Sequence, residues 1–371
     1  MRITLALLVL LGAGCAHFSV GPASNVFDEG TVEGARLLLR EDLAIAVVAT
    51  ASPVQAGERL AALAAEPGRD LLSDFDFCDF FRTFVQPALP DADELARTIP
   101  EPYRREVEAF ARAADLEPED LLRANCVADA CACTAFAASG SATTSGRLVV
   151  GRNLDFAPAH VLGRTTLVTV LHPEGAHAFV SIGWPGFSAV VTGMNDAGLC
   201  AAILINSEAA PRREGILLGF LVRLLLERCA SVKEARALFH ASSPASGHFV
   251  FLADDHDAAV VSRDAEDRSM ADGLLACVNG PLDLEPRGVL VTELLREAKG
   301  NIDDDVARSI LARTYLSGQN THAVVLVPGE REILLARGTT FAPAALGAWN
   351  RLSLARALAG DGDPVVTSLS R

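Results

Sequence analysis

The feature that most constrains the fold of this chain is a change of sequence pattern at Cys133. Between about residues 30 and 125, apolar residues recur every three to four positions between Pro and Asp turns, which is typical of amphipathic helices. The predicted helices span 34–40, 57–65, 75–87, 102–114 and 118–124. After Cys133 the apolar runs shorten and are separated by Gly, Pro and Asn-Asp turns, so strands are expected there.

The order of the elements after Cys133 predicts how the sheets are built. The predicted strands span 134–138, 147–151, 165–171, 178–183, 188–192, 199–205, 249–253, 258–262, 274–278, 323–327 and 332–336. The predicted helices of this region span 216–228, 232–240, 289–299 and 303–315. Because strands and helices come in blocks, we expect an α+β fold of antiparallel sheets packed with helices rather than a parallel βαβ sheet.

Composition and charge exclude several classes of protein. The 371 residues are 50% hydrophobic, so the chain has enough apolar material to bury a large core. A net charge of −15 repels phosphate backbones and no basic cluster occurs, so nucleic acid is not an expected partner. The sequence has no G-x-G-x-x-G or P-loop pattern, and its eight cysteines lack paired zinc-site spacing.

The first residues predict export. Residues 1–14 have a basic start at Arg2 and a short apolar run at 3–11, which is too short to span a bilayer. The run ends in Gly-Ala-Gly followed by Cys15, which resembles the lipobox of bacterial lipoproteins. That resemblance implies a diacylated Cys15 as first mature residue, a linker at 15–29, and a location in the bacterial cell envelope with the lipid as the only membrane anchor. The alternative is an ordinary cleaved signal peptide.

Four motifs in the second part of the chain carry nucleophilic chemistry. They are Cys133-Thr134 at the change of pattern, Gly151-Arg152-Asn153-Leu154-Asp155, Gly193-Met194-Asn195-Asp196-Ala197-Gly198-Leu199, and Cys277-Val278-Asn279. As an ordered set they resemble the motifs of cysteine-dependent N-terminal-nucleophile (Ntn) hydrolases. The most similar branch is the penicillin acyltransferase-type (acyl-coenzyme A:6-aminopenicillanic-acid acyltransferase) peptidase family, to which choloylglycine hydrolases are related. The resemblance covers about residues 115–340.

This resemblance implies a four-layer αββα sandwich preceded by a helical segment. Residues 30–132 would form a propeptide or α-chain, and residues 133–371 would form the catalytic β-chain that begins at Cys133. Self-cleavage before Cys133 would give this residue an α-amino group with a reference pKa of about 7.7–8.0, which suits a base for its own thiol. The reaction would be acyl transfer from an amide to the thiol, then to water or an amine, without metal or cofactor.

The remaining predicted site residues surround this nucleophile. Arg152, expected on the neighbouring strand of a hairpin, would stabilise the thiolate, and Asp155 would hydrogen-bond the α-amino group. Asn195 and Asn279 would donate to the oxyanion. Three aromatic residues are expected to line the pocket for a hydrophobic acyl group of a small-molecule amide. They are Phe156, Trp184 and Phe187.

Other interpretations of the same residues stay open. Cys133 has the pattern of a buried core cysteine, and Arg152 and Asp155 have that of a structural ion pair. Asn195 and Asn279, which Gly280 and Pro281 follow, have the pattern of turn residues, and the three aromatic residues have that of core residues. Cys131 is a rival nucleophile, although the Thr after Cys133 and the small Ala132 before it favour Cys133. A papain-type Cys-His enzyme is a further alternative, but none of the eight His residues has a sequence context typical of such an enzyme. A non-enzymatic surface lipoprotein that binds a ligand is the alternative function, and cleavage before Cys133 would exclude it.

Overall fold

The computed structural model describes residues 26–85, 94, 98–126, 132–209, 214–339 and 342–369. The predicted export signal, Cys15 and Cys131 lie outside these residues.

Two sheets form the centre of the molecule. One has ten strands in the order β1 (Gly30–Val32), β2 (Ala35–Arg40), β3 (Leu43–Ala51), β6 (Leu167–Pro173), β7 (Phe179–Gly183), β8 (Thr192–Asn195), β9 (Cys200–Leu204), β10 (Phe249–Ala253), β11 (Ala258–Val261) and β12 (Arg268–Ser269). The other has seven strands in the order β13 (Leu274–Val278), β4 (Ala132–Ala138), β5 (Val149–Asp155), β14 (Asn320–Val327), β15 (Glu332–Arg337), β16 (Trp349–Ser353) and β17 (Val365–Leu369). Neighbouring strands are antiparallel except at the parallel β3–β6 pair.

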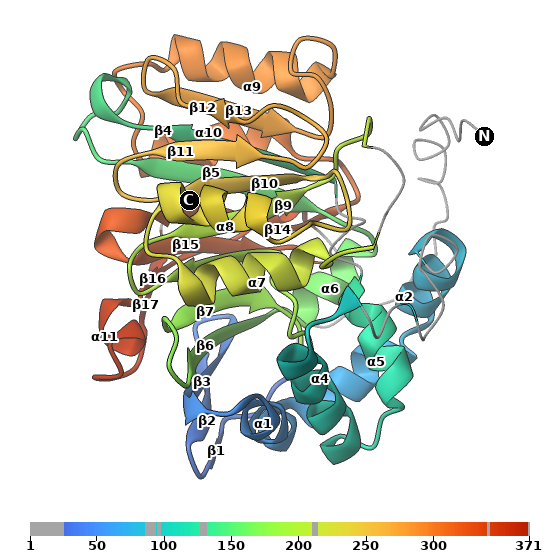
Figure 1. The fold of residues 1–371 in the computed structure, drawn as a ribbon. Helices are drawn as coiled ribbons and strands as arrows, with labels where there is room; N and C mark the ends of the chain where they lie inside the picture. The colour runs from blue at the N-terminus through green and yellow to red at the C-terminus, as the bar shows by residue number, and fades with distance from the viewer. Residues whose placement is uncertain are drawn as a thin grey trace.

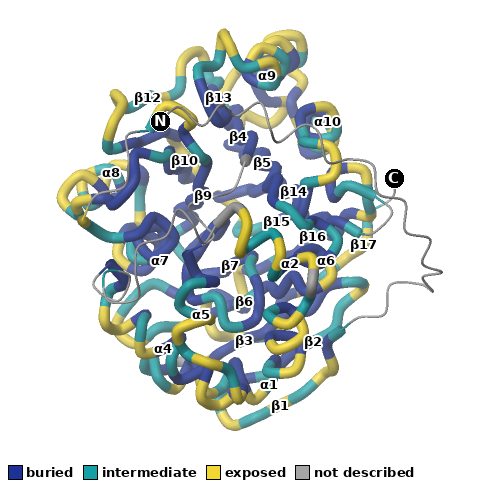
Figure 2. The backbone as a smooth tube through the Cα atoms, turned by 90° about the vertical axis from the view of Figure 1, so that its right-hand side faces the viewer, coloured by how far each residue is buried: buried dark blue, intermediate teal, exposed yellow. Residues whose placement is uncertain are grey.

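Helices cover the outer face of each sheet, so the fold is the predicted four-layer αββα sandwich (Figure 1). Helices α7 (Leu218–Arg228) and α8 (Val232–Ala241) pack on the ten-stranded sheet, and α9 (Pro286–Glu297) and α10 (Asp304–Thr314) pack on the seven-stranded one. The largest apolar cluster fills the space between the sheets, and the central strands are buried along their length (Figure 2). The α+β prediction is confirmed.

The sequence pattern predicts only helices before Cys133, but the structure has strands there as well. Residues 30–51 form the strands β1 to β3, and the predicted helix 34–40 is strand β2. The alternation in β2 buries Ala35 and Leu37, whereas β3 is apolar on both faces and has a β-branched run suited to an interior strand. Gly34 has a φ of +76°, which the tight turn into β2 requires. This segment therefore belongs to the ten-stranded sheet.

The helices that follow form a separate layer beside the sandwich (Figure 1). They are α1 (Pro53–Ser73), α2 (Phe75–Phe80), a π-helical turn at Phe81–Val85, α4 (Glu101–Ala113) and α5 (Pro118–Ala124). Ser52 begins α1 with a capping box, because its side chain accepts from the Gln55 backbone while the Gln55 side chain accepts from the Ser52 backbone. Gly57 permits the close approach of α1 to α4, since a Cβ there would lie 2.2 Å from the Glu106 carbonyl oxygen.

The predicted strand at 188–192 is wrong, because β8 begins only at Thr192. The backbone N–H groups of Ser188 and Ala189 donate to the Asn125 side chain at 2.8 and 3.0 Å, and that of Val190 donates to the Gly219 carbonyl. These backbone N–H groups therefore make their hydrogen bonds outside the sheet rather than to a neighbouring strand. The sequence analysis also missed the helices α6 (Ala159–Arg164) and α11 (Ala355–Leu358) and the strands β12, β16 and β17.

Candidate active site

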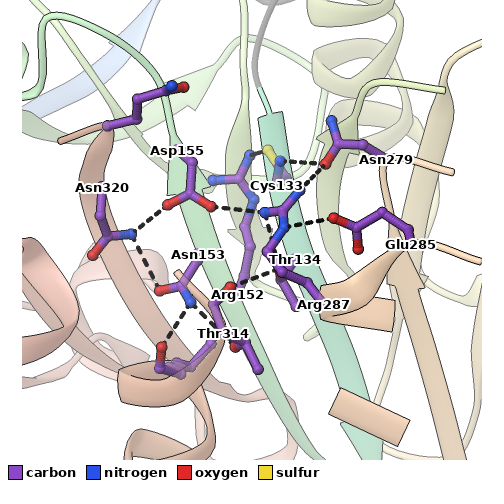
Figure 3. A network of polar contacts seen from close by, with 12 residues as sticks. Cys133, Thr134, Arg152, Asn153, Asp155, Asn279, Glu285, Arg287, Thr314 and Asn320 are labelled. Atoms are coloured by element: carbon purple, nitrogen blue, oxygen red, sulfur yellow. Dashed lines mark hydrogen bonds and ion pairs between the residues drawn. The ribbon is translucent and has the colours of Figure 1, made fainter. Parts of the chain in front are cut away.

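Cys133 is the second residue of β4, between β5 and β13, and its side chain is fully buried among the apolar residues between the sheets. Polar side chains from five elements or their ends converge around it (Figure 3). This is the point at which the sequence pattern changes, so the predicted nucleophile lies in the buried interior of the sandwich.

The backbone nitrogen of Cys133 is held by a side chain. The ladder between β4 and β13 ends at the pair Thr134–Val278, and one residue further the Asn279 side chain replaces a backbone acceptor. Its Oδ1 accepts from the Cys133 N–H at 2.6 Å and from Arg287 Nη2 at 3.2 Å. Because both partners are donors, the Asn279 atom that faces them is assigned as the amide oxygen. The Nδ2 group of Asn279 is then the one that can donate to an oxyanion.

The sulfur of Cys133 faces a buried cation. Strand β5 pairs with β4 in the predicted hairpin, and Arg152 lies opposite Ala135 with its Nη2 3.3 Å from the Cys133 sulfur. The same Nη2 donates to the Ile203 carbonyl of the opposite sheet at 3.1 Å. Burial raises the pKa of the Cys133 thiol, and the Arg152 charge opposes that rise by favouring the thiolate. The structure thus brings Arg152 to the thiol.

Behind Arg152 lies His322, one of the eight His residues for which the sequence analysis found no recognisable context. Its Nε2 is 2.9 Å from Arg152 Nη1 and 3.1 Å from Thr192 Oγ1. A register shift in β14 between Asn320 and His322 turns these two side chains to opposite faces of the sheet. His322 therefore faces the thiol side with Arg152, while Asn320 faces the helices.

The Asp155 side chain contacts Arg287 and Asn320, and its predicted hydrogen bond to an α-amino group at Cys133 stays a prediction. Because side chains alternate along β5, Arg152 points between the sheets and Asp155, three residues later, points to the opposite face. Its Oδ2 accepts from Arg287 at 3.0 Å and its Oδ1 accepts from Asn320 at 2.9 Å. Burial raises the pKa of Asp155 to about 6, and the Arg287 charge limits the rise.

Arg287 connects Asn279 with Asp155 and was missed by the sequence analysis. It lies in the first turn of α9 and contacts Asp155, Asn279 and, at 2.9 Å, the Glu285 carboxylate (Figure 3). No motif marks it, and Pro286 at the helix start is the only local signal. Arg287 therefore links the group that holds the Cys133 nitrogen to the carboxylate on the far face of β5.

Asn195 is not arranged as the predicted oxyanion donor. Its Nδ2 donates to the carbonyl oxygens of Leu226 at 2.8 Å and Cys229 at 2.7 Å, and its Oδ1 accepts from the Leu199 N–H. Both amide hydrogens thus bind carbonyls at the end of α7. This side chain closes the turn and the helix end, and has no donor left for a substrate oxygen.

The three predicted pocket residues are mostly core residues in this chain. Phe156 is 2% exposed and packs edge-on against Phe80, with ring centroids 5.2 Å apart. Trp184 is 3% exposed, donates from Nε1 to the Leu162 carbonyl, and contacts the half-buried Phe187 ring at 5.1 Å. Their role as an acyl pocket stays a prediction.

In the part of the chain that the structure describes, no group of three or more His, Cys, Asp and Glu side chains is arranged to hold a metal ion. In the same residues, no helix has both the length and the apolar character needed to cross a membrane.

Two sheets face to face between helical layers, with a cysteine at the start of a central strand, define the class of Ntn hydrolase folds. Residues 141–324 match the family described as acyl-coenzyme A:6-aminopenicillanic acid acyl-transferase. The match confirms the resemblance found in the sequence, which was to this same family of enzymes. Cys133 precedes the matched segment, whereas Arg152, Asp155, Asn279, Arg287 and His322 lie within it.

Individual relatives match smaller parts of the chain. Protein dcd1A of Dictyostelium discoideum is 27% identical over 181 residues, which are 43% of this chain and 41% of the relative. An uncharacterized protein of Archaeoglobus fulgidus is 38% identical over 68 residues, 18% of this chain and 11% of the relative. The chain thus spans about two fifths of the length of the first of these relatives and about a tenth of the second.

Solved structures of amidases are also similar. The Caenorhabditis elegans ortholog of N-acylethanolamine-hydrolyzing acid amidase aligns with a TM-score of 0.44 and 19% identity over 53% of this chain and 93% of that one. A variant of conjugated bile acid hydrolase from Clostridium perfringens aligns with a TM-score of 0.46 and 12% identity, over 64% and 97% of the two chains.

Proposed function

We propose that the protein is an exported, self-processing Ntn amidohydrolase or acyltransferase that acts on an N-acyl amide bond through an N-terminal Cys133. The family supports an enzyme of amide-bond hydrolysis or acyl transfer. The finer proposal concerns the processing step, the nucleophile, the substrate and the location.

One observation carries the proposal: the nitrogen and the sulfur of Cys133 are each held by a separate buried partner. Asn279 Oδ1 accepts from the nitrogen at 2.6 Å, and Arg152 donates to the sulfur at 3.3 Å. A cysteine with only a packing role needs neither contact. A residue that supplies both base and nucleophile needs its nitrogen and its thiol oriented independently.

Processing would start with attack of the Cys133 thiol on the carbonyl carbon of Ala132. The C–N bond breaks, the acyl group moves to sulfur, and water then hydrolyses the thioester. The products are a carboxylate at Ala132 and an α-amino group at Cys133. Asn279 Oδ1, which already accepts from this nitrogen, would hold the new amine with its lone pair directed to the thiol.

In the catalytic cycle the amine would take the thiol proton, and the thiolate would attack the substrate carbonyl carbon. Asn279 Nδ2 would donate to the resulting oxyanion. The protonated amine would then give its proton to the leaving amine, which leaves an acyl thioester on Cys133. Water or a second amine would release the acyl group and restore the thiol. Arg152 and Arg287, as nearby cations, would favour the unprotonated form of the amine at neutral pH.

The substrate would be a small-molecule amide with a hydrophobic acyl group, since apolar and aromatic residues surround Cys133. The proposed location is the bacterial cell envelope, where the lipid on Cys15 would anchor the protein.

Mass spectrometry and N-terminal sequencing of the purified mature protein test the proposal. We expect two fragments, of which the second starts at Cys133, and hydrolysis of N-acyl aminocoumarin amides that depends on acyl length. Cys133→Ala should remain one chain and be inactive, with the wild-type circular dichroism spectrum. A single uncut chain with full amidase activity would overturn the nucleophile assignment. An uncut, inactive protein that binds an acyl ligand would favour the lipoprotein alternative.

A further inference from the structure

Arg152 between the sheets and Arg223 of α7, on the outer side of the ten-stranded sheet, are both buried, and their surroundings are opposite in kind. Arg223 of α7 is paired with two carboxylates, Glu106 at 2.6 Å and Glu227 at 2.8 Å. Arg152 is equally buried, yet its hydrogen-bond partners in the described part of the chain are a thiol, a backbone carbonyl and His322. No carboxylate oxygen in that part is within ion-pair distance of Arg152. Its charge is thus left without a direct counter-ion.

The contact between Arg152 and His322 determines the tautomer of the His322 imidazole. A guanidinium can only donate hydrogen bonds, so His322 Nε2 must accept, and the proton of the neutral ring is assigned to Nδ1. The Thr192 hydroxyl, 3.1 Å from the same nitrogen, then donates as well. Burial and the Arg152 charge lower the pKa of His322 well below its usual value, which agrees with a neutral ring.

His322 also lies where it can set the direction of the guanidinium. It is on β14, whose residue Val324 is opposite Arg152 in the ladder, and it holds Nη1 at 2.9 Å. The Ile203 carbonyl holds Nη2, and the remaining direction of Nη2 is toward the Cys133 sulfur. Since a guanidinium is planar, holding one nitrogen fixes the others.

We propose that His322 is a positioning residue, which directs Arg152 to the Cys133 sulfur as an uncharged acceptor and so leaves the arginine charge for the thiolate. A carboxylate at this position would direct Arg152 equally well but would neutralise it. The inference rests on the proposed function, in which the thiolate of Cys133 is the nucleophile.

His322 does not itself serve as the base of a Cys-His pair. Its Nε2 accepts from Arg152, which lies between it and the thiol. Its other ring nitrogen, Nδ1, is buried and has no hydrogen-bond partner in the part of the chain that the structure describes. The residue therefore acts through Arg152, and its effect is expected on the thiol rather than on substrate binding.

Three variants separate orientation from charge. His322→Gln keeps a neutral acceptor, His322→Glu supplies a charged one, and His322→Leu has none. The readout is the pH dependence of Cys133 alkylation by iodoacetamide, measured by mass spectrometry of the chain that contains Cys133, which needs no substrate. We expect the thiol pKa of the Gln variant to stay near that of the wild type, and those of the Leu and Glu variants to rise by about one to three pH units. Their kcat should fall with KM little changed.

The control is His177→Gln, which alters a histidine bonded to Asp196 at 2.6 Å and should leave the thiol pKa unchanged. Melting temperatures identify variants that fail to fold, and the comparison of Gln with Glu decides the proposal even if the Leu variant is lost. Equal thiol pKa values in folded Gln and Glu variants would overturn it. If Cys133→Ala keeps wild-type activity, the proposed function fails. The alkylation measurement does not depend on that activity, so the failure of the proposed function and the failure of the His322 proposal can be distinguished.

Discussion

Glu106 of α4 and Arg223 of α7 form a buried bidentate ion pair, with Nη1–Oε1 at 2.7 Å and Nη2–Oε2 at 2.6 Å. The guanidinium also lies over the Tyr103 ring, whose hydroxyl donates to Glu227 at 2.8 Å. Helix α4 precedes the proposed cleavage point and α7 follows it, so this cluster connects the two prospective chains. The parallel pairing of β3 with β6 connects them a second time.

The first prediction is that the two chains stay together after cleavage. Separation would expose the edge of β6 and leave Arg223 buried with one carboxylate fewer, which is costly. Size-exclusion chromatography without denaturant should give one peak that contains both fragments. Glu106→Gln should lower the free energy of unfolding by about 3–5 kcal/mol, as expected when one partner of a buried pair is removed.

Glu101→Gln is the matched control, because Glu101 pairs with Arg105 on the exposed side of the same helix and each side chain is 60% exposed. Its effect should be below about 1 kcal/mol. Equal stability losses in the two variants, or separate elution of the two fragments, would contradict the prediction.

The second prediction concerns Arg287 and the pH dependence of stability. The pKa of Asp155 is about 6 in the folded chain and 3.8 in the reference state, so the folded protein binds the proton more tightly. The contribution of Asp155 to the free energy of unfolding is therefore complete below pH 3.8 and is lost as the pH rises through about 6. Arg287→Met removes the cation at 3.0 Å and should raise the Asp155 pKa by about one to three pH units.

Urea unfolding between pH 4 and pH 8 measures this change: the loss of stability should move to higher pH in Arg287→Met. Arg164→Met, at the partly exposed pair with Asp74, should leave the profile unchanged. A carboxyl-carbon NMR titration assigns the shift to Asp155, and an unaltered Asp155 titration in Arg287→Met would count against the proposed coupling.

The part of the site that sequence predicted well is the pair Cys133 and Arg152. A residue at the start of one strand and another 19 positions on come close in an antiparallel hairpin. In the structure Arg152 is opposite Ala135, two residues from Cys133, and its Nη2 reaches the Cys133 sulfur. The Asp155 side chain lies on the opposite face from Arg152, as the period of two in a strand requires for residues three apart. Local pattern was therefore sufficient for the hairpin, while the contact of Asp155 with an α-amino group at Cys133 stays a prediction.

The other site residues depend on long-range contacts that no local pattern encodes. His322 reaches Arg152 from a strand 170 positions later, and a register shift decides which way it faces. Arg287 is one arginine at a helix start. The strands at 30–51 were taken for helix because leucines separated by arginine and glutamate satisfy both periods over a short window, and only the pairing of β3 with β6 settles the choice.

The third prediction distinguishes Cys133 from Cys131. A thiol can attack only the carbonyl of the residue directly before it, so Cys131 would cut after Ala130. Two residues of extended chain span about 6–7 Å, so a site built around the contact of Arg152 with Cys133 does not suit a nucleophile two residues earlier in the sequence. Cys131→Ser should keep most of the self-cleavage and amidase activity, whereas Cys133→Ala loses both. The reverse pattern on a chromogenic amide would identify Cys131 as the nucleophile.

The fourth prediction concerns membrane attachment. If Cys15 is diacylated, Cys15→Ser should move the protein from the membrane fraction to the soluble fraction of the envelope, with its activity retained. The mass of the first peptide of the wild-type protein measures the modification directly. A wild-type protein that is already soluble and carries no acyl mass would show that residues 1–14 are an ordinary signal peptide.

The fifth prediction separates the two asparagines that sequence had placed in one role. Asn279 Oδ1 holds the Cys133 nitrogen, and Nδ2 is the donor proposed for the oxyanion. Asn279→Ala should therefore abolish most self-cleavage and lower kcat by roughly 10²–10³-fold, the usual effect of losing an oxyanion donor. Asn195 instead binds the Leu226 and Cys229 carbonyls at the end of α7.

Asn195→Ala should lower the free energy of unfolding by about 1–3 kcal/mol, since buried carbonyls lose their donor, while the folded variant keeps near wild-type kcat. Chemical unfolding and steady-state kinetics on the same preparations test both variants, and each acts as the control for the other. A hundredfold loss of kcat in Asn195→Ala at unchanged stability would restore Asn195 as an oxyanion donor, because a residue that only closes a helix end cannot produce that combination.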